Sequence, residues 1–249
     1  MPGAGPHART FYGRIRGKAL RPNQQRLLAE LLPTVAVPGV GRANAGDRAP
    51  VDPAALFGPG RPVWLEIGFG GGEHLVQTAV SNPEVGLIGC EPFVNGVAMA
   101  LARIETTGVT NLRLHAGDAR DLIDLLPDAS LARVFLLYPD PWPKTRHRAR
   151  RFMNPENLAA LARVMQPGAA LRLATDIPDY AAHARAAVAA LGAGGGFALR
   201  GGPTDWARPW PGWLGTRYEA KALRAGRSPQ YLSFLRTGAA AVDGDRPIA

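Results

Sequence analysis

Apolar and polar positions alternate in blocks along most of this chain. Short apolar runs of strand length are each followed by a longer segment with apolar residues at helical spacing. The pattern predicts strands over residues 63–68, 85–90, 111–115, 131–138 and 169–175. It predicts helices up to residue 82 and over residues 93–106, 119–126, 154–166 and 178–191. Five strand–helix units in series are typical of an α/β protein with a doubly wound, mostly parallel, Rossmann-like sheet.

The chain beyond residue 192 departs from this rhythm. Residues 193–215 show no regular pattern, although they carry three tryptophans. A short helix is predicted over residues 216–225 and a last strand over residues 231–235. A strand that follows a long irregular stretch fits a sheet extended at one edge.

The first 60 residues differ in composition from the alternating region. Six basic side chains precede the first acid, Glu30: Arg9, Arg14, Arg16, Lys18, Arg21 and Arg26. Residues 24–32 have a short helical pattern, and residues 33–62 are rich in Pro, Gly and Ala, which favours a linker or surface loop. We therefore expect a basic N-terminal arm with a helix and linker (1–60), an α/β domain (61–236) and a disordered tail (237–249), with residues 1–8 disordered as well.

Composition narrows the classes of partner and cofactor. The 249 residues include 29 Lys and Arg against 20 Asp and Glu, a net charge of +9 that favours a polyanion, although the abundance of Arg, Ala, Gly and Pro also fits nucleotide bias. The single cysteine, Cys90, excludes an intrachain disulfide and a thiolate zinc site, and the five histidines lack metal-ligand spacing. No apolar run reaches the roughly 20 residues of a membrane span. We expect a cytoplasmic protein without a metal.

Acidic residues follow or end five successive predicted strands: Glu66, Glu91, Asp118, Asp140 and Asp176. The carboxyl ends of parallel strands meet at one edge of the sheet, where open α/β sheets bind ligands. A single acid at such a place is often a helix cap, and Asp118 could be a cap, an acceptor for an adenine amine, or both. Five together predict an acid-lined cleft.

The turn after the first strand is rich in glycine. Residues 65–72 read Leu-Glu-Ile-Gly-Phe-Gly-Gly-Gly, with the spaced glycines Gly68, Gly70 and Gly72. Such a turn lets backbone approach a ligand closely, although a tight turn without a ligand is the alternative. Glu66 would repel a pyrophosphate but attract an ammonium or sulfonium group, and S-adenosylmethionine carries both cations and no phosphate. Glu91 is placed to accept hydrogen bonds from ribose hydroxyls.

The apolar run that starts at Val134 ends in a proline-framed loop, Tyr-Pro-Asp-Pro-Trp-Pro-Lys, that carries Asp140 and Trp142. An acid beside an aromatic ring suits a heteroaromatic base, with Trp142 either stacked on the base or packed in the core. Residues 144–151 hold five Lys or Arg side chains, which suit phosphates but could also form a solvated face. The loop therefore indicates a nucleic-acid base as the target.

At these residues the sequence resembles the bacterial tRNA (guanine-N7)-methyltransferases, the TrmB family of class I S-adenosylmethionine-dependent methyltransferases. The matching segments are residues 65–72, 89–91, 139–144, 146–151, 174–176 and 216–219, and the basic stretch 9–18 resembles the start of the family. The resemblance covers about residues 9–236. It implies a class I methyltransferase fold and transfer of a methyl group from S-adenosylmethionine to N7 of guanosine 46 in the variable loop of tRNA.

The resemblance also assigns roles to residues. Cofactor binding falls on Glu66, Glu91, Asp118 and Asp140, and on the turn glycines Gly68, Gly70 and Gly72, with Asp140 also catalytic. Substrate binding falls on Lys144, Asp176, Thr216, Arg217, Tyr218 and Glu219, and RNA contact on Arg146, His147, Arg148, Arg150 and Arg151. Thr216 and Glu219 alone would suggest a helix capping box. Arg217 and Tyr218 stand where Lys or Asn and Phe are common in the family, and Pro143 is one of several residues found at its position, which leaves the implied activity intact. The expected partner is tRNA, without an obligatory protein partner, for a monomer or homodimer.

Three other classes explain less of the sequence. A nicotinamide-dependent dehydrogenase shares the glycine turn and Glu91 but gives no reason for Glu66 or for Asp140 between prolines. A methyltransferase of DNA amino groups would prefer an Asn- or Asp-Pro-Pro-aromatic motif, and protein remains another possible target class. A non-catalytic RNA-binding protein needs no acidic cleft.

The implied reaction also predicts a role for Asp140. Guanine N7 has a free lone pair, so Asp140 is expected to stabilise developing positive charge rather than to act as a base.

Overall fold

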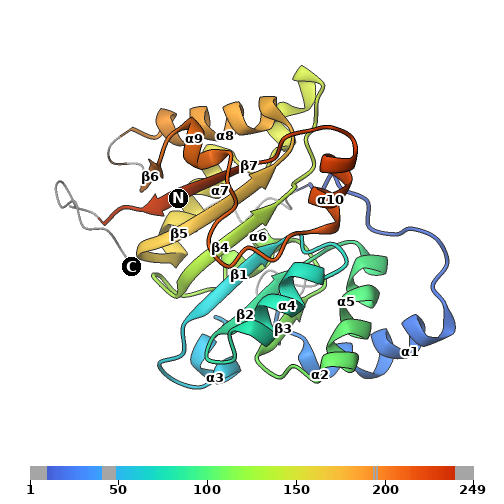
Figure 1. Cartoon of the computed structure of the whole chain (residues 1–249). Helices are drawn as coiled ribbons and strands as arrows, with labels where there is room; N and C mark the ends of the chain where they lie inside the picture. Colours follow the sequence, from blue (N-terminus) through green and yellow to red (C-terminus); the bar gives the residue numbers. More distant parts are fainter. Residues whose placement is uncertain (1–9, 41–48, 193, 195, 239–249) are drawn as a thin grey trace, which may run out of the picture.

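The computed structural model describes residues 10–40, 49–192, 194 and 196–238. These residues form a seven-stranded sheet with helices on both faces (Figure 1). The strands are β1 (Val63–Ile67), β2 (Gly86–Cys90), β3 (Leu112–His115), β4 (Leu131–Leu137), β5 (Met165–Thr175), β6 (Phe197–Arg200) and β7 (Gln230–Arg236).

The helices are α1 (Pro22–Glu30), α2 (Leu32–Val35), α3 (Pro53–Phe57), α4 (Glu73–Ser81), α5 (Val94–Thr107), α6 (Ala119–Ile123), α7 (Pro155–Val164), α8 (Pro178–Ala190), α9 (Pro203–Trp206) and α10 (Arg217–Arg224). A 3-10 helix, η1 (Thr145–Arg150), follows the proline-framed loop. Local signals explain several helix starts. The side chain of Asn154, for example, accepts a hydrogen bond from the backbone of Asn157 at 2.9 Å, with Pro155 in the first turn, as the sequence predicts for α7.

The strand order is β3-β2-β1-β4-β5-β7-β6. Strands β1 to β5 are parallel, and β7 runs antiparallel to both β5 and β6. The predicted doubly wound, mostly parallel sheet is confirmed, and the last predicted strand does extend it beyond β5. The chain order reverses beside β1, because β2 and β4 lie on its two sides. A topological switch of this kind opens a crevice at the carboxyl ends of the central strands.

Three hydrophobic clusters pack against the described sheet, one on one face and two on the other. Successive side chains of β4 alternate, so that Val134 and Leu136 face α6, α7 and α8, while Phe135 and Leu137 face the opposite side. On that opposite side, α1, α4 and α5 cover the half formed by β1 to β3. The other half is covered by Trp210 and the irregular segment around it.

Parts of the chain predicted to be irregular contain regular structure. The stretch 193–215 includes β6 and α9, and the presumed linker 33–62 includes most of α2 and all of α3. The backbone of Val37 bonds Leu114 at 2.9 Å, and Val51 is buried in the core. The disorder expected for residues 1–8 and for all but the first two residues of 237–249 lies outside the described residues. The Thr237 amide donates to the Gly196 carbonyl at 3.0 Å. Helix α7 ends at Val164, so β5 begins four residues before its predicted start.

Candidate active site

A cleft of about 520 Å³ opens at the carboxyl ends of the central strands. Its lining combines the glycine turn after β1, the acid after β2, the acid before α6 and the proline-framed loop after β4. The main polar and glycine residues in it are Gly68, Gly70, Glu91, Asp118, Asp140 and Asn157. The structure thus brings together three of the strand-end acids expected to share a cleft, and its volume suits a ligand of nucleoside size.

The Glu91 carboxylate is buried at the centre of this cleft. One oxygen accepts a hydrogen bond from the Gly70 amide at 2.7 Å and the other accepts one from the Phe93 amide at 2.9 Å. Burial raises the pKa of Glu91, the two backbone donors oppose that shift, and the nearby charge of Asp140 adds to it. Each oxygen has a further lone pair, so Glu91 is able to accept from vicinal hydroxyls of a ribose.

The absence of a side chain leaves open space at one residue of the glycine turn and permits close helix packing at another. Gly68 has φ of +74°, lines the cleft and would place a Cβ where no protein atom lies within 4 Å. A Cβ at Gly72 would instead lie 2.6 Å from the side chain of Ala100. Gly68 and Gly70 therefore fit the predicted cofactor role, whereas Gly72 lets α4 and α5 pack closely.

Asp118 is a helix cap, one of the two roles expected for it. Its carboxylate caps α6 by accepting from the Arg120 amide at 3.0 Å, and it forms an ion pair with the Arg120 guanidinium. The same residue lines the cleft. Its capping role is therefore present, and its position remains compatible with binding an adenine amine.

Glu66 does not line the cleft. Its buried carboxylate lies 2.7 Å from Nδ1 of His74 on the face of the sheet that α4 covers. His74 in turn packs against Trp213, with ring centroids 5.0 Å apart. A direct contact between Glu66 and the cofactor is thus not what the geometry supports, because β-strand alternation turns this side chain away from the ligand side. Glu66 instead joins β1 to the first turn of α4 through His74.

The loop that follows β4 has an unusual backbone. Tyr138 and Trp142 both have positive φ, 49° and 41°, and they bracket Asp140. Left-handed backbone costs a residue with a Cβ about 1–2 kcal/mol, so surrounding contacts must hold it. Asp140 is exposed and lines the cleft. Trp142 is half-buried at the rim, 5.0 Å from the Arg150 guanidinium, so its indole is available at the cleft rather than packed in the core.

The segment Thr216–Glu219 borders the cleft beside this loop, where the rings of Tyr138 and Tyr218 stack with centroids 6.5 Å apart. Thr216 and Glu219 form the capping box of α10, and the Glu219 carboxylate also accepts hydrogen bonds from Trp213 and Tyr231. Arg217 and Tyr218 lie directly above the glycine turn, each with an atom 3.3 Å from the position that a Cβ of Gly70 would take. The segment predicted to bind substrate therefore meets the turn predicted to bind the cofactor, with Glu219 turned inward.

Comparisons with known proteins agree with this geometry. A family model described as "Putative methyltransferase" matches residues 60–228. The chain is 56% identical over 238 residues to a tRNA (guanine-N(7)-)-methyltransferase of Ruegeria sp. (strain TM1040), covering 94% of this chain and 92% of that protein. The chain belongs to the tRNA (guanine-N(7)-)-methyltransferase family.

A second relative and one solved structure are also similar to this methyltransferase. The tRNA (guanine-N(7)-)-methyltransferase of Roseobacter denitrificans (strain ATCC 33942 / OCh 114) is 55% identical over 231 residues, covering 93% of this chain and 97% of that protein. The crystal structure of precorrin-6y C5,15-methyltransferase from Geobacter metallireducens GS-15 has a TM-score of 0.50 at 14% identity, covering 72% of this chain and 80% of that one. This likeness concerns the fold, which is the Rossmann-like fold of S-adenosylmethionine-dependent methyltransferases.

The basic segment of the methyltransferase divides into outward and inward residues. Lys144, Arg146 and Arg148 are exposed beside the cleft, whereas the guanidinium of Arg150 lies over the ring of Tyr12 at 4.4 Å. Arg151 has a side chain that is 0% exposed. Its guanidinium bonds the proline-framed loop and α8, so this geometry does not support the RNA contact predicted for Arg151.

Sequence reasoning missed two contributions to the site. Residues 10–14 of the arm line the cleft, and the Thr10 carbonyl accepts a hydrogen bond from Arg120 at 3.2 Å. The adjacent aromatic residues within a basic stretch were the available signal. The second is Arg227, whose Nε donates to the Asp176 carboxylate at 2.5 Å and which no motif marks.

Among the described residues, no helix combines the length and apolarity that crossing a membrane requires. Within the same residues, no group of three His, Cys, Asp or Glu side chains is arranged to hold a metal ion.

Proposed function

We propose that this chain transfers the methyl group of S-adenosylmethionine to N7 of a guanosine in tRNA, at position 46 of the variable loop. The observation that carries the proposal is the cleft itself. Acidic side chains lie at the ends of three parallel strands, and cationic side chains lie on the loop and helix around its mouth. Acids inside suit a cationic donor, and cations outside suit a polyanion.

The residues of the cleft fit S-adenosylmethionine in three places. Glu91 is the ribose acceptor, Asp118 the acceptor for the adenine amine, and the open side of Gly68 the place where backbone approaches the donor. When bound, the donor supplies a methyl carbon already activated by a sulfonium. The chain's own residues then have two tasks, which are to orient the base and to stabilise positive charge.

Asp140 is the proposed catalytic residue. Guanine N7 attacks through an in-plane lone pair, so no proton has to be removed before the carbon–nitrogen bond forms. Positive charge moves onto the purine as the carbon–sulfur bond breaks, and a fixed carboxylate at the edge of the cleft stabilises it. One such contact in a site that excludes water contributes about 3 kcal/mol, or roughly a hundredfold in rate.

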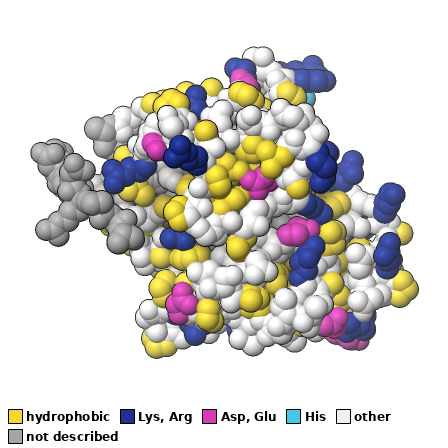
Figure 2. Space-filling model, in the orientation of Figure 1, with side chains coloured by type: hydrophobic (Ala, Val, Ile, Leu, Met, Phe, Trp, Pro, Cys, Tyr) yellow, Lys and Arg dark blue, Asp and Glu magenta, His cyan; other side chains and the backbone are white. Residues whose placement is uncertain are grey.

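Substrate recognition is proposed for the residues around the mouth. Asp176, held by Arg227, and Lys144, at the end of the loop that carries Asp140, are two of these residues. Arg217 and Tyr218, above the glycine turn, are two more. Figure 2 shows Lys and Arg side chains gathered along the edge of this face where α10 and the N-terminal arm lie. Arg146, His147, Arg148 and Arg150 on η1 continue this basic margin. Phosphate contacts of this kind add affinity that falls with salt.

The test uses purified protein, S-adenosylmethionine labelled in its methyl group and an unmodified tRNA transcript. After digestion to nucleosides, the label should elute as 7-methylguanosine, and a transcript with adenosine at position 46 should stay unlabelled. Label in another nucleoside, in protein or in DNA would overturn the proposal. Location in the cytoplasm, and action without a protein partner as a monomer or homodimer, follow as further predictions.

A further inference from the structure

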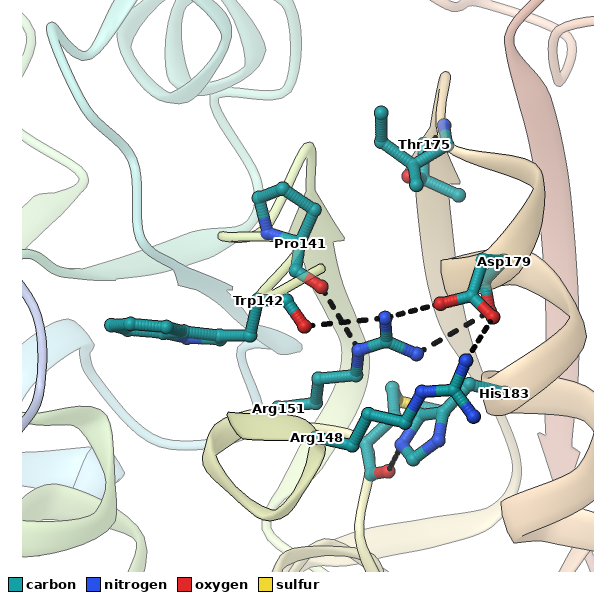
Figure 3. Close-up of polar contacts among 9 residues, drawn as sticks. Pro141, Trp142, Arg148, Arg151, Thr175, Asp179 and His183 are labelled. Carbon is teal, nitrogen blue, oxygen red and sulfur yellow. Dashed lines mark hydrogen bonds and ion pairs between the residues drawn. The ribbon is translucent and has the colours of Figure 1, made fainter. Parts of the chain in front are cut away.

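Arg151 is a buried arginine that the proposed methyl transfer does not yet use. Its side chain is 0% exposed, and a buried guanidinium costs free energy unless its donors are paired. It ends the cationic run directly after η1, in which Arg146 and Arg148 are exposed and Arg150 is half-buried. Figure 3 shows its guanidinium between the proline-framed loop on one side and α8 on the other.

The guanidinium joins these two elements through both of its edges. Nε donates to the carbonyl of Pro141 at 2.9 Å, and one terminal nitrogen lies 3.5 Å from the carbonyl of Trp142. The same terminal nitrogen bonds the carboxylate of Asp179 at 2.5 Å, and the Tyr180 ring lies 5.4 Å away. A lysine ammonium is a point charge without this planar fork, so it could not bond the loop and α8 in the same geometry.

The proline-framed loop has few backbone donors with which to form other hydrogen bonds. Pro139, Pro141 and Pro143 carry no backbone N–H, so the loop is anchored through its carbonyl groups. Its first residue is held by β5, where the Tyr138 amide donates to the Ala174 carbonyl at 2.7 Å. Its far end is held by Arg151. Asp140 lies between these two anchors, and the left-handed backbone at Tyr138 and Trp142 makes both anchors necessary.

Asp179 completes the clamp on the outer side. The hydrogen bond from Arg151 lowers the pKa of Asp179, so the acid stays charged. Its second oxygen accepts from Arg148 at 2.9 Å, as the dashed lines in Figure 3 show. In the same figure the Trp142 indole extends away from the guanidinium, so Arg151 holds the backbone of the loop and leaves the ring free at the cleft.

We propose that Arg151 is a positioning residue for methyl transfer: it clamps the proline-framed loop to α8 and so fixes the carboxylate of Asp140 in the cleft. The inference rests on the function proposed above, since it explains how the acting carboxylate is held. It replaces the RNA contact that the sequence suggested for Arg151. It also makes Asp179, an exposed acid outside the cleft, part of the same clamp.

The main test is a double-mutant cycle in the methyltransferase assay with Arg151→Lys and Asp140→Ala. Arg151→Lys alone should lower kcat at saturating donor and tRNA by about 10- to 100-fold, the loss expected when a reacting group is misplaced by about 1 Å. The KM for tRNA and the donor affinity by calorimetry should stay close to wild type. In the Asp140→Ala background the same substitution should cost less than about twofold, because the residue it positions is gone.

Arg163→Lys is the matched control. Arg163 also donates to backbone carbonyls, that of Leu126 at 2.8 Å and that of Ile123 at the end of α6 at 2.7 Å, but it does so at the opposite end of the sheet. Its replacement should lower thermal stability without changing kcat. Asp179→Asn removes only the outer anchor, at a surface residue, and should also lower kcat. If Arg151→Lys does not fold, Asp179→Asn provides the test.

Three results would overturn the inference. An unchanged kcat with a raised KM for tRNA and a weaker salt dependence would make Arg151 an RNA contact. Equal losses in the two backgrounds would show that it does not act through Asp140. An unchanged kcat in Asp179→Asn would remove the clamp to α8. A wild-type protein that forms no 7-methylguanosine would refute the proposed function instead, so the two failures are distinguishable.

Discussion

Replacing Gly68 with alanine should weaken donor binding far more than it weakens the fold. Gly68 has φ of +74° and lines the cleft, and a Cβ there would meet no protein atom within 4 Å. The fold therefore loses only the cost of placing alanine in left-handed backbone, about 1–2 kcal/mol. The donor, however, would meet a methyl group where the backbone was bare.

Gly108 supplies the matched control. It has φ of +64°, it also has no atom within 4 Å of a built Cβ, and it ends α5. The cleft adjoins the start of α5, so Gly108 lies about 20 Å away along the helix. Both alanine variants should lose similar stability in thermal unfolding. In calorimetry, only Gly68→Ala should lose affinity for S-adenosylmethionine, by at least about tenfold, or about 1.4 kcal/mol. Equal donor affinity in the two variants would refute the assignment of the cleft.

Three further predictions concern the arm, the basic edge and pH. Deleting residues 1–20 should weaken tRNA binding and flatten its salt dependence in filter binding, and should also lower donor affinity because residues 10–14 line the cleft; a change in neither would contradict this role. Replacing exposed Lys221 and Arg224 on α10 with alanine should raise the KM for tRNA and reduce the salt slope by about one per lost phosphate contact, with kcat kept. Because burial raises the pKa of Glu91, donor affinity should fall as the pH drops towards the ordinary glutamate value of about 4.3, and Glu91→Gln should show no such fall in calorimetry; identical pH profiles would exclude Glu91 as the titrating group.

The sequence predicted the parts of the fold that local signals encode. The five parallel strands follow from apolar runs of the right length, and α7 follows from Asn154 and Pro155. Strand β6 was missed because four residues beside a glycine-rich stretch become a strand only by pairing with β7. Helix α3 had a readable start, since Asp52 caps it and Pro53 opens it, but its five residues fall below the length at which periodicity is informative.

In the site too, some residues could be placed from local sequence signals, and others are placed only by tertiary contacts. Glu91, Asp118 and Asp140 could be placed from strand ends alone, because parallel strands bring those ends together. Glu66 could not be, since its carboxylate bonds a histidine of α4 on one face of the sheet and does not line the cleft. Arg151 looked like its cationic neighbours, and only the tertiary approach of Asp179, 28 residues later, shows that it is buried. Residues 10–14 reach the cleft through a path that no local pattern specifies.

The most direct measurement of the central claim is a crystal structure of this chain with S-adenosylhomocysteine. The account predicts ribose hydroxyls at Glu91, the adenine beside Asp118, and the sulfur in the space between Gly68 and the loop that carries Asp140. A molecule bound instead in a second cavity, which is lined by Gln24, Met99 and Arg103, would contradict the account. A complex in which the Asp140 carboxylate points out of the cleft would do so as well.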